Sequence, residues 1–61
     1  MSSKPATRFY TVAQVADLLA VSSRTVRRWV AAGDLPAHRF GRRVRISESD
    51  LRAFVQKGRT P

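Results

Sequence analysis

The sequence predicts a small, mainly α-helical domain in which three helices carry one two-stranded β-hairpin between the second helix and the third. Three observations predict this fold. Helix starts of one kind recur three times, each a serine or threonine cap before an apolar periodicity. Gly33 and Pro36 end the second helix. An alternating stretch with β-branched residues follows at once, and Gly41 at its centre marks a turn.

The three helix starts are predicted from their caps. Thr11 and Gln14 form a capping box, in which each side chain satisfies a backbone N–H of the other residue. Ser22 and Ser47 are the second and third caps, and Asp50 holds the box position of the third. Each cap lies inside a hydrophobic staple, and the stapled pairs are Tyr10 and Val15, Val21 and Val26, and Ile46 and Leu51.

Apolar residues at spacings of three and four define one buried face in each helix. We expect helices over residues 12–19, 23–32 and 48–57. Only residues 20–22 separate the first two helices, which must therefore cross at a steep angle, as in a helix-turn-helix. The predicted inner faces are Val12, Val15, Ala16 and Leu19 in the first helix, Val26, Trp29 and Val30 in the second, and Leu51, Phe54 and Val55 in the third.

The predicted hairpin spans residues 37–46. Val44 and Ile46 are expected to face inward while Arg43 and Arg45 face outward, because successive side chains of a strand alternate between its faces. A two-stranded ribbon needs packing against helices to be stable. The hairpin is therefore expected to lie beside the helices as a wing, which makes the fold class a winged helix-turn-helix.

The chain is expected to hold one domain, because 61 residues allow only a single, marginal core. We place the domain at residues 9–57, with flexible basic tails at residues 1–8 and 58–61. No apolar run approaches the ~20 residues of a membrane span, and the N-terminus lacks the apolar stretch of a signal peptide. A soluble cytoplasmic protein is therefore expected.

The charge of the chain is strongly one-sided, with 12 lysines and arginines against 4 acidic residues and a formal net charge of +8. Such a charge favours a polyanionic partner, and double-stranded DNA is the leading one. An anionic membrane surface is the alternative. It would need one long amphipathic helix with a basic side, but Gly33, Pro36 and Gly41 interrupt any such helix. We therefore expect no membrane binding.

Seven of the twelve basic residues lie between residues 22 and 46, where Asp34 is the only acid. A helix can enter the major groove of DNA, and a hairpin beside it can reach a neighbouring groove or the backbone. A merely solvated surface would mix both signs of charge. The candidate DNA-binding residues are Ser23, Arg24, Thr25, Arg27 and Arg28 on the second helix, and Arg39, Arg42, Arg43 and Arg45 on the wing.

Different roles are expected along this surface. The first residues of a recognition helix usually meet base edges, which favours Ser23 and Arg24. Arginine suits guanine and phosphate equally well, so which arginines read bases stays open. At the wing tip, Arg42 and Arg43 fit a narrow minor groove or the flanking phosphates. The arginines on the arms of the wing are expected to contact phosphates.

The aromatic residues have two possible roles. Trp29 and Phe40 could act as wedges between base steps. The spacing favours the core for Trp29, and Phe40 is expected to pack at the base of the hairpin. Tyr10 and Phe54 are expected in the core. His38 is expected to be partly exposed, with no special role.

No catalysis, cofactor or metal site is expected. The chain has no cysteine and one histidine, and its four acidic residues are separated from one another by helix surfaces and turns. It contains no nucleophile paired with a base and no glycine-rich phosphate loop. These absences disfavour an enzyme and leave binding as the expected role.

Taken together, these features resemble a known family, the excisionase-type winged helix-turn-helix, which is a small-domain relative of the MerR DNA-binding head. The resemblance covers about residues 9–55. It is carried by the segments YTVAQVADLL (10–19), VSSRTV (21–26), WV (29–30), GDLPA (33–37) and FGRRVRI (40–46).

The resemblance implies that Ser23, Arg24, Thr25, Arg27 and Arg28 face the major groove and that Arg42 and Arg43 lie in the wing. It also implies a recombination directionality factor. Such a protein binds attachment-site DNA in several copies, bends it and helps a tyrosine integrase excise a prophage or mobile element. A MerR regulator would continue into a long dimerisation helix, so a chain that stops at Pro61 is not expected to respond to an effector.

One module of this size buries only ~600–1,000 Å² on DNA, so specific action needs neighbouring copies or a partner. We expect a monomer in free solution that associates head-to-tail on DNA. The alternative function is a small phage or plasmid transcriptional repressor that uses the same helix and wing. An RNA-binding domain is disfavoured because no aromatic stacking platform on a sheet is apparent.

Overall fold

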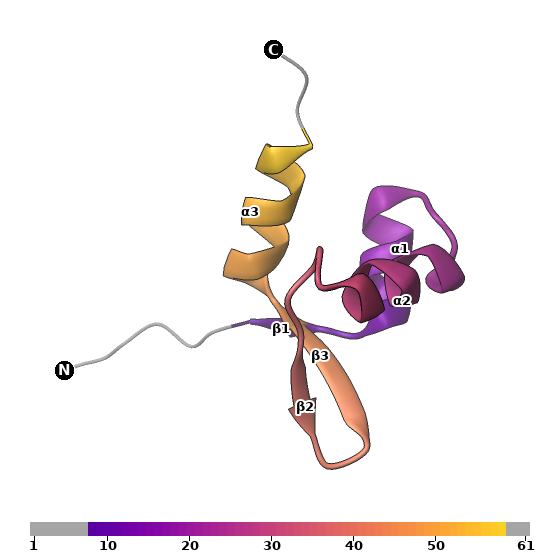
Figure 1. The fold of residues 1–61 in the computed structure, drawn as a ribbon, viewed down its shortest axis with the longest axis vertical. Helices are drawn as coiled ribbons and strands as arrows, with labels where there is room; N and C mark the ends of the chain where they lie inside the picture. Colours follow the sequence, from indigo (N-terminus) through magenta and orange to yellow (C-terminus); the bar gives the residue numbers. More distant parts are fainter. Residues whose placement is uncertain (1–7, 59–61) are drawn as a thin grey trace, which may run out of the picture.

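A computed structural model of the chain describes residues 8–58 and confirms the predicted fold class (Figure 1). The helices have the expected bounds. Expectations about the tails at residues 1–7 and 59–61 lie outside the described residues. In chain order the elements are β1 (Phe9–Tyr10), α1 (Val12–Leu19), α2 (Ser23–Ala32), β2 (His38–Phe40), β3 (Arg43–Ser47) and α3 (Glu48–Lys57).

The hairpin is anchored at its base, where β3 packs against α1 and α3, while its turn end extends beyond the helices. In Figure 1, α1 and α2 lie side by side, α3 stands beside this pair, and the β2–β3 hairpin projects away from all three helices. The turn end of the hairpin therefore has the exposure that a wing requires.

Within residues 8–58, none of the helices has the length and apolar character needed to cross a membrane.

All three predicted helix caps are present. The first is a full capping box, because Gln14 Oε1 also accepts from the backbone N–H of Thr11 at 2.9 Å. Each cap is worth about 1 kcal/mol and acts over only three residues, so it fixes a helix start locally. The cap bonds run from Gln14 N to Thr11 Oγ1 (3.0 Å), from Thr25 N to Ser22 Oγ (3.1 Å) and from Asp50 N to Ser47 Oγ (3.2 Å).

Two residues with left-handed backbone conformations, Ala20 and Gly33, flank α2 and set the direction of the chain before and after it. Ala20, with φ 57°, closes α1, and its N–H donates to the carbonyls of Ala16 and Asp17. A non-glycine residue pays ~1–2 kcal/mol for this conformation. The bond from Val21 N to Ala16 O at 2.9 Å helps to hold the tight turn before α2. Gly33, with φ 83°, ends α2 as predicted.

The core lies between the helices and β3. Trp29, Phe54 and Tyr10 are half-buried and pack against it as predicted, and the Trp29 and Phe54 ring centroids lie 4.9 Å apart. Leu35 is completely buried and was not predicted, because it stands in the link after α2, where no periodicity marks it. The buried apolar residues are Val15, Ala16, Val26, Leu35, Ile46 and Leu51.

Two side chains that were expected to pack inside are exposed. Val55, predicted on the inner face of α3, is 43% exposed, because α3 meets the core through Leu51 and Phe54 and leaves Val55 at the rim. Phe40 is 51% exposed. The expectation that it packs at the base of the hairpin is wrong: Phe40 pairs with Arg43 next to the turn, and its ring lies outside the core against Phe9, with 5.5 Å between the two ring centroids.

The sheet has three strands where two were predicted, in the order β1-β3-β2. In β1, Phe9 pairs with Ser47 and Tyr10 with Ile46. The two-residue strand is too short to show an alternation, which is why the sequence pattern missed it. Arg8, which was assigned to the tail, accepts a hydrogen bond from Glu48 N at its carbonyl, at 2.8 Å. This bond ties Arg8 to the start of α3.

Candidate nucleic-acid interface

The outer surface of α2 is basic. Arg24, Arg27 and Arg28 are exposed and line one shallow hollow together with Thr25. The Thr25 hydroxyl lies 2.9 Å from Ser22 Oγ, so the cap that starts the helix also orients this side chain. Ser23 is half-buried and does not line the hollow. Of the five candidates on this helix, four therefore share one surface.

A second hollow, which we call the arginine groove, runs between α2 and the hairpin. The start of α1 (Thr11–Ala13) forms part of its wall. Sequence reasoning missed this contribution, because nothing local shows that the start of α1 lies near the wing. The arginines that line the groove are Arg27 from α2 and Arg39, Arg42, Arg43 and Arg45 from the hairpin.

Arg27 links the two hollows, since it lines both of them. Apart from Ser23, the predicted candidates on the helix and on the wing thus form one continuous basic surface. This convergence is the geometric condition for a helix and a wing to act on one ligand. That these residues contact DNA stays a prediction.

The arginines differ in exposure along this surface. Gly41 takes a φ of 65° at the turn, and Arg42 and Arg43, the first residue of β3, are exposed at the tip. Arg45, expected to point freely outward, is instead half-buried, and its Nη1 donates to the carbonyl of Val44 at 2.9 Å. A guanidinium has five N–H donors, so Arg45 keeps further donors for a ligand while its position is fixed.

Acidic side chains are kept away from this surface. None of the four acids of the chain lines the helix hollow or the arginine groove. Glu48 Oε2 lies 3.8 Å from Arg52 Nη2, and Asp50 Oδ2 lies 3.5 Å from His38 Nε2. Within residues 8–58 no carboxylate lies within ion-pair distance of a groove arginine. Such a field raises the local concentration of a polyanion.

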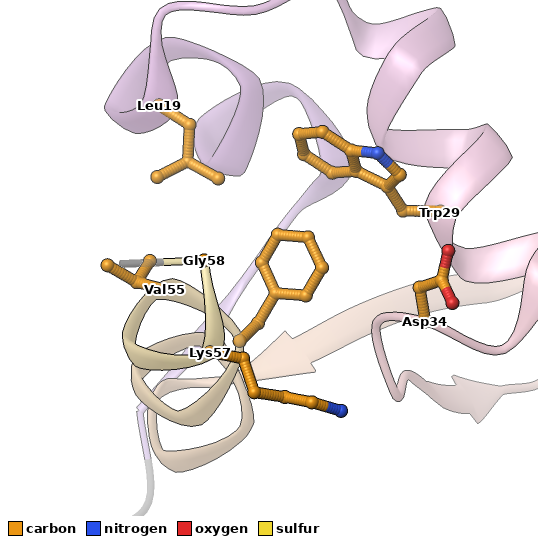
Figure 2. A pocket seen from close by; sticks show the side chains of 7 residues that line it. Leu19, Trp29, Asp34, Val55, Lys57 and Gly58 are labelled. Atoms are coloured by element: carbon orange, nitrogen blue, oxygen red, sulfur yellow. The ribbon is translucent and has the colours of Figure 1, made fainter. Parts of the chain in front are cut away.

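A third hollow, shown in Figure 2, has a different chemistry. Leu19 lies opposite Val55, Trp29 lies beside Phe54, and Asp34 and Lys57 are its charged residues. It opens because Val55 stands at the rim of α3. In the described part of the chain, no group of three or more metal-ligating side chains comes together here or elsewhere. The arginine groove is therefore the better candidate for a functional site.

Comparison with known proteins assigns the fold to a family. A model of the helix-turn-helix domain family matches residues 9–59. An uncharacterized protein of Bacillus subtilis (strain 168), YvgK, is 46% identical over 48 residues, which are 79% of this chain and 16% of that protein. The putative DNA-binding protein Rv0500A of Mycobacterium tuberculosis (strain H37Rv) is 52% identical over 40 residues, 66% of this chain and 51% of that one.

This chain covers most of the length of a further relative. The excisionase of Mycobacterium phage D29 is 40% identical over 47 residues, which are 75% of this chain and 84% of the excisionase. By contrast, this chain spans only 16% of the Bacillus subtilis relative and about half of the mycobacterial protein. The family model and the phage relative together confirm the expected resemblance to excisionase-type helix-turn-helix proteins, while the relation to the MerR head stays a prediction. The chain therefore belongs to the helix-turn-helix domain family and is an excisionase-like member of it.

Proposed function

We propose that this chain binds double-stranded DNA with α2 in the major groove and the β2–β3 wing in the adjacent minor groove or on the flanking phosphates. One observation carries the proposal: Arg27 and the four wing arginines line one groove from which acids are absent. A helix and a wing that share one surface can together reach two adjacent grooves of a duplex.

The basic surface divides into parts with different tasks. Arg24 and Arg28 stand on the helix surface, where a guanidinium fork can read guanine or hold phosphate. Thr25 offers a methyl group and a hydroxyl beside them. The wing tip carries Arg42 and Arg43, whose charge is favoured in a narrow minor groove. Arg39 and Arg45 are assigned to phosphates, which set the register of the domain on the duplex.

The biological role we propose is that of an excision factor. Several copies bind attachment-site DNA head-to-tail, bend it and promote excision by a tyrosine integrase. The excisionase among the relatives and its 84% coverage support this role. The protein then acts as an architectural DNA-binding protein without catalysis, on DNA in the bacterial cytoplasm. The alternative is transcriptional repression by the same surface, which would need neither a bend nor an integrase.

An excision reaction reconstituted with a tyrosine integrase and its attachment-site DNA tests the role. The chain should stimulate excision from a substrate that carries both attachment sites, and circular-permutation mobility shifts should show a bend centred on its footprint. Arg27→Ala should lose both effects. Arg52→Ala is the matched control, because it removes the same charge from an exposed arginine outside the groove.

The same experiment separates the alternative function. A protein that occupies a promoter and blocks transcription, without bending DNA or changing the yield of excision, would be a repressor. Loss of duplex binding in Arg52→Ala equal to that in Arg27→Ala would contradict the proposed interface itself. In that case net charge alone, and not the arginine groove, would explain the binding.

A further inference from the structure

Three aromatic rings gather on the outer face of the sheet. Phe9 of β1 lies with its ring centroid 5.5 Å from the rings of both His38 and Phe40 of β2, nearly perpendicular to each. The His38 and Phe40 rings are 6.2 Å apart and almost parallel, at 16°. We call these three residues the aromatic face. The sequence pattern could not reveal it, because Phe9 is brought there by pairing of β1 with β3.

Much of this aromatic surface remains open. Phe40 is 51% exposed and Phe9 39%, although burying a phenylalanine is one of the larger gains available to so small a domain. Neither ring belongs to the residues packed on the core. The rings pack against one another, but much of their surface remains exposed to solvent.

The surroundings of the aromatic face are cationic. Phe40 pairs with Arg43, and His38 pairs with Arg45. Directly opposed side chains in an antiparallel sheet share a face, so the rings adjoin two arginines. Both arginines also line the arginine groove, which therefore meets the aromatic face along β3.

One acid reaches this face, because Asp50 Oδ2 lies 3.5 Å from His38 Nε2. Between Leu35 and Ser47 the chain has four arginines and no acid. Within residues 8–58 no carboxylate pairs with Arg43 or Arg45, and Glu48 lies beside Arg52 instead, so positive charge is in excess around the rings. A ligand suited to this face must therefore offer both planar apolar rings and negative charge. Unpaired nucleotides have this combination, because their bases stack on aromatic side chains while their phosphates pair with arginine.

We propose that the aromatic face of Phe9, His38 and Phe40 binds unpaired bases of single-stranded DNA, as a site separate from the duplex interface. The inference goes beyond the proposed function and does not depend on it. Because Arg43 and Arg45 border both surfaces, an unpaired strand on the rings would lie next to a duplex held in the groove.

Fluorescence anisotropy with two labelled probes tests the proposal. One probe is a ten-residue oligothymidylate, and the other is an abasic strand with the same number of phosphates. The wild-type chain should bind the thymidine strand about tenfold more tightly, since stacking contributes about a factor of ten per base held. Equal affinity for both strands would show that only phosphates are bound and would overturn the proposal.

Substitutions assign the effect to the rings. Phe40→Leu keeps apolar bulk but removes the planar face, and it should lower affinity for the thymidine strand to that for the abasic strand. Binding of a 20-base-pair duplex should change less than twofold. Leu18→Ala is the control, because it alters an exposed apolar residue outside the aromatic face, and it should leave both affinities unchanged. Circular dichroism checks that each variant is folded.

Photocrosslinking provides an independent readout. A thymidine strand with one 5-iododeoxyuridine should crosslink to Phe9, His38 or Phe40, as located by mass spectrometry. Crosslinks confined to α2 would overturn the proposal. So would a Phe40→Leu variant that changes self-association in sedimentation while single-strand binding is unaltered, because the face would then dock a second copy. Each of these failures leaves duplex binding through Arg27 untouched, so the two proposals are judged separately.

Discussion

Arg27→Ala is the most informative perturbation of the proposed duplex interface, because this residue alone lines both the helix hollow and the arginine groove. Its side chain is exposed, and no ion pair within residues 8–58 involves it. Alanine is also the best helix former. The substitution should therefore leave folding intact, and any loss of DNA affinity can be assigned to the missing contact.

The size of the effect follows from counterion release. If about five phosphates are neutralised per copy, log affinity should fall with log salt at a slope of about −4.5. Removing one phosphate contact should reduce the slope to about −3.6. Between 50 and 200 mM salt, the wild-type affinity should fall about 500-fold and the variant affinity about 150-fold. The ratio of wild-type affinity to variant affinity should thus fall about threefold between 50 and 200 mM salt.

The assay is an anisotropy titration of one labelled duplex at four or more salt concentrations, with wild type, Arg27→Ala and the control Arg52→Ala. The control should keep the wild-type slope, because Arg52 lies on α3 beside Glu48. An unchanged slope in Arg27→Ala would refute the claim that this arginine meets phosphate. A flat response in all three proteins would refute the electrostatic account of the whole interface.

Three further predictions concern the fold and the assembly. Leu35→Ala should lower the free energy of unfolding by about 2–5 kcal/mol in a urea titration, because it leaves a cavity at a completely buried site; a loss below 0.5 kcal/mol would show that Leu35 is not part of the core. Ser22→Ala should cost about 1 kcal/mol in thermal melts by removing the cap of α2, and Ser49→Ala, at an exposed site, should cost less. Sedimentation without DNA should give a monomer, whereas a stable dimer would contradict that expectation and direct attention to exposed Leu18 and Val55.

The helices were predictable because their signals are local. The capping bonds at Thr11, Ser22 and Ser47 each join residues three positions apart, so a short window of sequence contains both partners. The basic character of α2 was readable for the same reason. Gly33 and Gly41 marked the end of α2 and the hairpin turn, where each takes a positive φ.

The features that were missed depend on contacts between distant residues. β1 exists because Tyr10 pairs with Ile46, and no short window of sequence contains both. The aromatic face follows from that pairing. Leu35 is buried by its position in the fold, although its own segment has no period. The half-buried setting of Arg45 and its bond to Val44 could be seen only once the hairpin had a register.

Ser47 belongs to the end of β3 and also caps α3, so no linker separates the wing from the last helix. It is 4% exposed, and its hydroxyl accepts from Asp50 N at 3.2 Å. A strand that runs directly into a helix ties the base of the wing to α3. Because α3 meets the core through Leu51 and Phe54, the wing is anchored to the core at its C-terminal side, and its orientation relative to α2 is set by packing rather than by a linker.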